Sequence, residues 1–216
     1  MFHCLVNIMI KVENSKMYTL RKSLFGKHTF GGPPKHKGAT PVDSAVSTHL
    51  LLTLDLRDKK LPFSSDSLRY LPLYFPLKYG YGGPSMQYSV ISDDEIKIHY
   101  LSNPVPDSED SCYVKVSEFP RVRFSLGDLI ENDDPIDWFT ITVGGEPTLD
   151  HKPDQCLNAT CIHYKTEPNV DLICSLPPIK FKRSPDIWWE FEGAYLLFYF
   201  WLCRGCNSII TSNRAT

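Results

Sequence analysis

The C-terminal part of the chain holds the feature that most restricts its fold, an apolar and aromatic run that leads directly into a C-x-x-C motif. The run spans Ala194 to Cys203, and Cys203 and Cys206 form the motif. A second cysteine pair, Cys156 and Cys161, lies upstream. Two closely spaced thiols on each of two loops supply the four tetrahedral ligands that zinc prefers. We therefore expect one structural Zn²⁺ site that ties the end of the chain to its middle.

The ligand set leaves alternatives open. The first pair has C-x4-C spacing, within the usual range, but the separation from Cys161 to Cys203 is longer than in a compact zinc ribbon. His163 could replace Cys161 as a ligand, and Cys174 is a less favoured substitute. Four buried thiols without metal are a second interpretation. A redox dithiol in the C-x-x-C motif is a third, disfavoured because thioredoxin-type motifs open a helix in a βαβ context that this sequence lacks.

The surroundings of such a site follow from its charge. Four thiolates around one Zn²⁺ carry a local charge of about -2, since each thiolate brings one negative charge. We expect backbone N–H groups of the Cys203 turn to offset part of this charge, with Arg204 or Lys152 as nearby cations. Gly205 is expected to permit the tight turn between the two thiols.

Composition bounds the environment of the protein. The 216 residues suffice for one large domain or two small ones, and 42% hydrophobic with 22% charged residues indicate a globular chain. The apolar segment 2–10 lacks the basic region and cleavage site of a signal peptide, so we expect it to form a buried first strand. Seven cysteines are an odd number, which a secreted chain would not pair evenly, and together these features predict a cytoplasmic location. The run before Cys203 is too short for a membrane helix. A formal net charge of -2 gives no reason to expect nucleic acid or a membrane as partner.

Frequent prolines and short alternating apolar runs predict a mainly β, roll-like protein with few short helices. The chain has 17 prolines, which disfavour long helices. The basic segment 16–37 is interpreted as a solvated loop or an anion-binding edge, and one helical turn is expected from Ser125. The expected strands are 6–12, 49–56, 71–77, 86–92, 95–101, 113–116, 121–124 and 138–143. Prolines restrict 71–77 to a sheet edge, and Ser92, Asp93 and Asp94 are expected to form a turn.

A short repeat divides the chain. Thr29 to Pro34 and Thr142 to Pro147 share the pattern Thr-apolar-Gly-Gly-x-Pro, and a polar loop follows each. Paired glycines adopt positive φ at little steric cost. We interpret the pattern as a duplication with two β-rich halves, 1–125 and 126–216, the second holding the cysteine site; the two could also form one integrated domain.

The order of these motifs resembles the YwqG-like family of domains of unknown function, and more weakly the programmed-cell-death-2 type of zinc proteins. The matching positions are Gly144, Gly145, Pro147, Cys156, Cys161, Cys203 and Cys206. The first half also resembles a YwqG-like N-terminal unit, from Phe30 to Leu56. Leu149 stands where the family has an aromatic residue, and the first cysteine pair is wider than C-x-x-C. The resemblance implies a mainly β fold and no established enzymatic activity.

Two function classes remain. Phosphate-binding, metalloprotease and nucleophile-elbow motifs are missing from the sequence, and eight aromatics crowd the stretch 188–201. If strand alternation turns half of them outward, an exposed patch beside Trp188 and Trp189 would mark a partner surface. We therefore expect a non-catalytic protein that binds a specific protein partner. The alternative is an enzyme whose site is assembled from scattered residues, which a deep pocket with converging histidine and carboxylate groups would favour.

Overall fold

The structure is a computed structural model. Among the residues that it describes, every element of regular secondary structure is a β-strand. These residues are 9–13, 15–40, 48–76, 84–102, 119–130, 140–145, 152–177 and 196–215. The predicted mainly β fold is confirmed, and within these ranges the few expected helices do not occur. In chain order the strands are β1 (Ile10–Val12), β2 (Met17–Lys22), β3 (His28–Gly32), β4 (Thr48–Asp55), β5 (Phe63–Ser65), β6 (Tyr70–Pro76), β7 (Pro84–Ser92), β8 (Glu95–Leu101), β9 (Phe119–Ile130), β10 (Thr142–Gly144), β11 (Val170–Leu176), β12 (Leu196–Cys203) and β13 (Ser208–Ala215).

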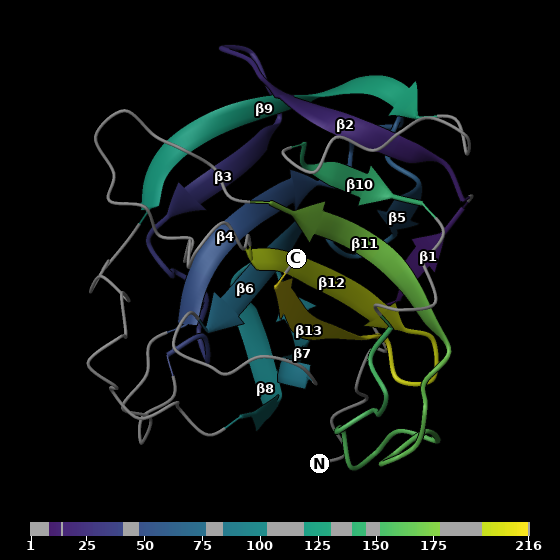
Figure 1. Ribbon diagram of the computed structural model, residues 1–216. Helices are drawn as coiled ribbons and strands as arrows, with labels where there is room; N and C mark the ends of the chain where they lie inside the picture. The colour runs from purple at the N-terminus through teal and green to yellow at the C-terminus, as the bar shows by residue number, and fades with distance from the viewer. Residues whose placement is uncertain are drawn as a thin grey trace.

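One 11-stranded antiparallel sheet contains all of these strands except the small β1–β5 pair. Its order is β6-β4-β3-β9-β2-β10-β11-β12-β13-β7-β8, and Figure 1 shows how strongly it curls. Strands from both predicted halves contribute to this sheet, and residue 125 lies within β9. No helix in the described part of the chain could cross a bilayer.

The curl brings the edge strand β6 against β7, near the opposite end of the sheet. The Tyr74 N–H donates to the Tyr88 hydroxyl at 2.9 Å, and that hydroxyl donates to the carbonyl of Pro72 at 2.9 Å. An edge strand normally leaves such backbone groups unpaired. Here one fully buried tyrosine from β7 satisfies two of them, which stabilises the closed side of the roll.

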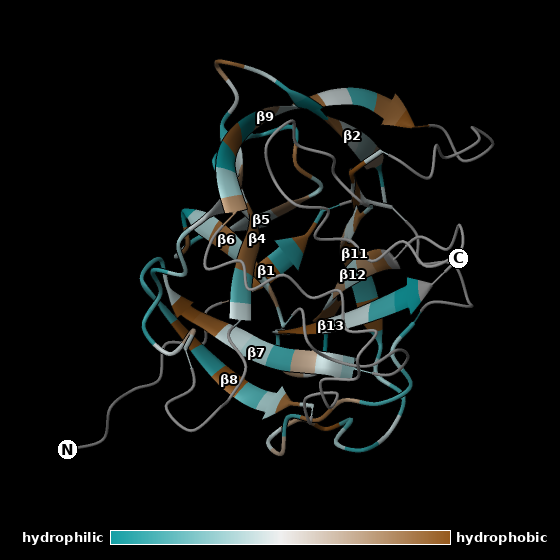
Figure 2. Ribbon diagram, turned by 60° about the vertical axis from the view of Figure 1, so that its left-hand side comes forward, coloured by the Kyte–Doolittle hydropathy of each residue, from teal (hydrophilic) through white to brown (hydrophobic). Residues whose placement is uncertain are grey.

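Several strand predictions are confirmed. The leucine-rich segment forms β4, the proline-containing β6 is an edge strand, and β7 and β8 form a hairpin around the Asp93–Asp94 turn. Hydrophilic and hydrophobic residues alternate along β8, the other edge strand (Figure 2). Of the expected strand at 6–12, residues 10–12 form β1. The expected strand at 113–116 lies outside the described residues, as do Cys4 and Cys112.

Two local predictions were wrong. The basic segment 16–37 is not a loop, because it contains β2 and β3, whose Leu20 and Phe30 are buried in the core. The helical turn expected from Ser125 is strand instead, since β9 continues to Ile130 and pairs with β2. In both places pairing with a strand about 100 residues away overrides a weak local preference.

The two glycine turns have matching conformations and matching places in the sheet. Gly31 and Gly32 have φ of 70° and 100°, and Gly144 and Gly145 have φ of 77° and 99°. The first pair ends β3, between β4 and β9, and the second lies at the end of β10, between β11 and β2. The β9–β2 pair lies between the two turns in the strand order, and the duplication itself stays a prediction.

Strand β12 is buried on both faces. Phe198 and Phe200 belong to the main core, whereas Tyr199 and Trp201 face a second apolar cluster that includes the cysteines. The expectation that alternation exposes half of the aromatics is therefore wrong for these four residues, because the cysteine cluster occupies the second face. Trp188 and Trp189 lie outside the described residues.

Candidate metal centre

The C-x-x-C motif forms the turn of the β12–β13 hairpin. Cys203 ends β12 opposite Ser208, and the Asn207 N–H donates to the Cys203 carbonyl at 2.7 Å. Asn207 has φ of 53°, so the left-handed residue of the turn is Asn207, and Gly205 has another role. A Cβ at Gly205 would lie 3.0 Å from Cys161 Sγ. The glycine therefore allows the turn from Cys203 to Cys206, the cysteine knuckle, to approach the first cysteine pair.

The first cysteine pair lies on a loop that closes on itself. The Cys156 N–H donates to the Thr166 carbonyl at 3.0 Å, and the Lys165 N–H donates to the Cys156 carbonyl at 2.7 Å. Inside the loop, the Cys161 N–H donates to the carbonyl of Asn158 at 2.9 Å, forming a tight turn. Because of this turn, the two thiols of the C-x4-C pair lie close together, and both belong to the same sulfur cluster.

The structure brings the four predicted cysteine sulfurs together. All four Sγ atoms lie within 4.8 Å of one another. The distances are 3.8 Å between Cys156 and Cys206, 3.7 Å between Cys161 and Cys203, and 3.9 Å between Cys203 and Cys156. Cys206 is half-buried, the other three are buried, and none of the four forms a disulfide. One metal ion could be held between these sulfurs.

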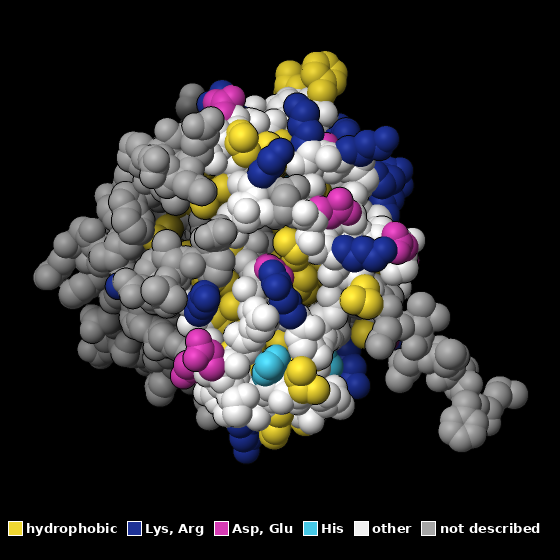
Figure 3. Space-filling view, turned by 90° about the vertical axis from the view of Figure 1, so that its right-hand side faces the viewer, with side chains coloured by type: hydrophobic (Ala, Val, Ile, Leu, Met, Phe, Trp, Pro, Cys, Tyr) yellow, Lys and Arg dark blue, Asp and Glu magenta, His cyan; other side chains and the backbone are white. Residues whose placement is uncertain are grey.

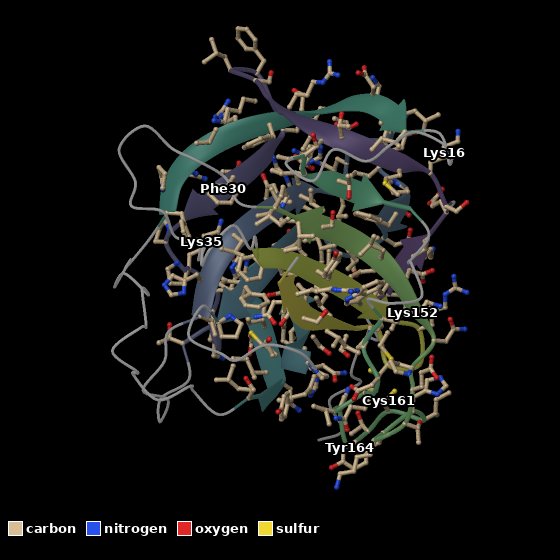
Figure 4. All side chains as sticks on the ribbon, viewed as in Figure 1. Lys16, Phe30, Lys35, Lys152, Cys161 and Tyr164 are labelled. Atoms are coloured by element: carbon tan, nitrogen blue, oxygen red, sulfur yellow. The ribbon has the colours of Figure 1, made fainter. Side chains whose placement is uncertain are left out.

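The other residues considered at the sequence level do not join the group. The His163 N–H donates to Cys161 Sγ at 3.4 Å, so this residue contacts the cluster through its backbone. Cys174 lies in the main core. The Arg204 guanidinium pairs with Asp171. Lys152 lines the same surface cavity as this ion pair. Figure 4 shows Lys152 and Cys161 on the same side of the molecule.

Gln87 on β7 is a member of the site that the sequence analysis missed. Its fully buried side chain donates from Nε2 to Cys156 Sγ at 3.1 Å and to Ser208 Oγ at 2.6 Å, and Oε1 accepts from the Leu157 N–H at 2.6 Å. These contacts join the loop, the hairpin and a third strand. The sequence offered one signal: Gln87 is a polar residue between Met86 and Tyr88 within the expected strand 86–92. Such a position is a weak indication of function.

Hydrogen bonds within the cluster favour negative charge on one sulfur. A hydrogen bond from Cys203 lowers the pKa of Cys206 to about 4, helped by Ser208, whose Oγ lies 3.0 Å from its sulfur. The same hydrogen bond and burial raise the pKa of Cys203. Burial raises the pKa of Cys161 to about 12. The cluster therefore already stabilises a thiolate, the form of cysteine that binds metals.

A cavity of about 390 Å³ lies between the second glycine turn and the cysteine knuckle. Its charged lining residues are Glu13, Lys152, Asp171 and Arg204, with Asp171 and Arg204 paired to each other. Histidine is not among the described residues that line it.

Comparisons of the chain with protein-family models, curated proteins and solved structures find no match. The resemblance to the YwqG-like family therefore stays a prediction.

Gln87 should contribute to metal affinity. Replacing it with leucine keeps the approximate volume but removes the N–H groups directed at the sulfurs, so we expect Gln87→Leu to bind Zn²⁺ about 10–100-fold more weakly. Competition with a chromophoric chelator measures this change. Ser85→Ala is the matched control, since Ser85 is buried on the same strand and its Oγ has no hydrogen-bond partner among the described residues. Equal affinity of the two variants would contradict this role for Gln87.

Proposed function

We propose that this protein is non-catalytic, that a structural zinc ion stabilises its fold, and that it binds a specific protein partner. The observation that carries the proposal is the spacing of the four sulfurs. A tetrahedral zinc site with Zn–S bonds of about 2.3 Å separates its sulfurs by about 3.8 Å. Three of the sulfur separations are 3.7, 3.8 and 3.9 Å and all lie within 4.8 Å, which supports one ion held between the four sulfurs.

The donor set supports a structural rather than a catalytic ion. Four thiolates complete the coordination of zinc, whereas catalytic sites keep one position for water or substrate. An ion held by Cys156, Cys161, Cys203 and Cys206 would connect two segments about 40 residues apart. Its binding free energy would therefore appear as folding stability. A reducing cytosol, where thiols stay available to metal, is the compartment that fits this proposal.

The loop that the ion would fix presents apolar side chains to solvent. Ile162 is 82% exposed and Tyr164 is 41% exposed, on either side of His163. Lys165 Nζ lies 5.2 Å from the centroid of the Tyr164 ring. Tyrosine is enriched among the residues that dominate protein interfaces, and a rigid loop loses little entropy on binding. These features support the zinc loop, residues 156–166, as the partner-binding surface.

The double variant Ile162→Ser/Tyr164→Ser tests the proposal. We expect the wild-type protein to retain a specific protein from cell extract and the variant to lose at least about 90% of it, because the central apolar contacts are removed. Both proteins should contain about one zinc per chain by elemental analysis, since neither substituted side chain belongs to the sulfur cluster.

Ile91→Ser is the matched control for this experiment, because Ile91 is a partly exposed apolar residue on β7. This variant should capture the partner as the wild type does. Capture by the double variant at the wild-type level would refute the loop surface. Zinc-free protein after expression with zinc supplied would refute the metal.

A further inference from the structure

The turn between β2 and β3 carries two apolar side chains that project into solvent. Leu24 is 86% exposed and Phe25 is 92% exposed. Strand β9 lies between β2 and β3 in the sheet, so this turn has to cross over it. Gly26 makes the crossing possible, because a Cβ there would lie 2.2 Å from the Phe124 carbonyl oxygen. The crossing raises the turn above the sheet and leaves its two apolar side chains without packing.

Positive charge surrounds this turn. The stretches 21–28 and 119–127 contain no acidic residue, and their basic residues are Arg21, Lys22, Lys27, Arg121 and Arg123. Two carboxylates nearby form ion pairs: Asp128 pairs with Arg21 at the surface, and the largely buried Asp58 pairs with Lys27. Figure 3 shows hydrophobic side chains projecting at the top of the molecule, with Lys and Arg side chains below them. The chain's net charge of -2 does not describe this local surface.

We propose that the β2–β3 turn docks on the surface of an anionic phospholipid bilayer. Leu24 and Phe25 enter the boundary between headgroups and acyl chains, and the surrounding Lys and Arg side chains contact the lipid phosphates. Apolar insertion combined with cations that attract anionic lipids is the basis of peripheral membrane binding. Long basic side chains keep their charge at the headgroup level while their methylene stems contact the apolar layer.

The shape of the surface favours a bilayer over a protein partner. A stable protein interface buries about 800 Å² on each side around a central anchor, which requires a broad complementary face. Here the apolar part is a narrow projecting tip of two adjacent residues, and charged residues flank it. Such a tip enters a fluid interface without a preformed pocket, and the positive surroundings complement anionic headgroups.

The tip and the zinc loop lie at opposite ends of the molecule. The turn between β2 and β3 is at the top of Figure 1, and Figure 4 shows the labelled Cys161 and Tyr164 at the bottom. A bilayer at the tip would therefore leave the zinc loop accessible. This inference goes beyond the protein–protein role proposed above and does not depend on it.

Co-sedimentation with vesicles tests the inference. We expect the wild-type protein to bind vesicles of phosphatidylcholine with 30% phosphatidylserine at least about tenfold more tightly than pure phosphatidylcholine vesicles, with binding that weakens as salt rises. Leu24→Ser/Phe25→Ser should reduce binding to the anionic vesicles at least about tenfold. Lys27→Gln/Arg123→Gln should reduce it about fivefold for each charge removed.

Ile91→Ser is the matched control, because it removes a partly exposed apolar side chain on β7, outside both the tip and the zinc loop. It should bind anionic vesicles as the wild type does. All variants should keep the wild-type melting temperature, since every substituted side chain is exposed. Absence of wild-type binding to anionic vesicles, or undiminished binding by the tip variant, overturns the inference. Loss of a protein partner by the tip variant, without loss of vesicle binding, also overturns it and assigns the tip to a protein interface.

Discussion

Cys206→Ser should lower the free energy of unfolding by at least about 4 kcal/mol. Structural zinc contributes about 10–16 kcal/mol of binding free energy in small zinc peptides, and the loss of one thiolate forfeits a large part of it. For a chain of this length the melting temperature should fall by about 8–16 °C. Serine is nearly isosteric with cysteine and Cys206 is only half-buried, so loss of packing cannot account for a decrease of this size.

A strong chelator distinguishes metal binding from packing. It should lower the melting temperature of the wild type by a similar amount and leave Cys206→Ser unchanged, because the variant has already lost its tight site. Cys174→Ser is the control. It alters a buried thiol outside the cluster, so it should cost some stability yet keep the full response to chelator. A wild type that does not respond to chelator would mean that the cluster is four buried thiols without metal.

Phe75→Ala should open the closed side of the roll. Phe75 on the edge strand β6 is fully buried, with its ring centroid 4.1 Å from that of Phe198 and 6.4 Å from that of Phe200. Strands β6 and β12 are far apart in the order of the sheet, so this contact crosses the interior. Truncation should cost about 3–5 kcal/mol through lost burial and the resulting cavity, which lowers the melting temperature by about 6–20 °C.

Differential scanning calorimetry measures this effect. Phe25→Ala is the matched control, since it makes the same change at a side chain that is 92% exposed, and its stability should stay within about 0.5 kcal/mol of the wild type. A loss below about 1 kcal/mol for Phe75→Ala would show that the contact between β6 and β12 does not hold the roll closed.

Local sequence patterns were sufficient for several features of this protein. Alternation and proline content predicted the mainly β class, because period-two burial is a property of neighbouring residues. The two glycine pairs predicted equivalent turns, because positive φ at two successive positions is a local requirement that glycine meets. Cysteine spacing predicted which four thiols would come together, since a short turn brings the two thiols of each pair close to one another.

Other features depend on contacts between distant segments. The segments that became β2 and the end of β9 have weak strand signals, and each is a strand because it pairs with the other across about 100 residues. Burial of both faces of β12 follows from the position of the cysteine loop, which local alternation cannot specify.

Gln87 gives the clearest case of a role decided by tertiary structure alone. It lies 69 residues from Cys156 and 121 from Ser208, and it contacts both only because β7 pairs with β13 beside the knuckle. The exposed tip of Leu24 and Phe25 has a similar origin, since β9 lies between β2 and β3 and forces the turn across its backbone. Local periodicity specifies which residues form strands, but strand order decides which side chains meet, and that order depends on the packing of the whole sheet.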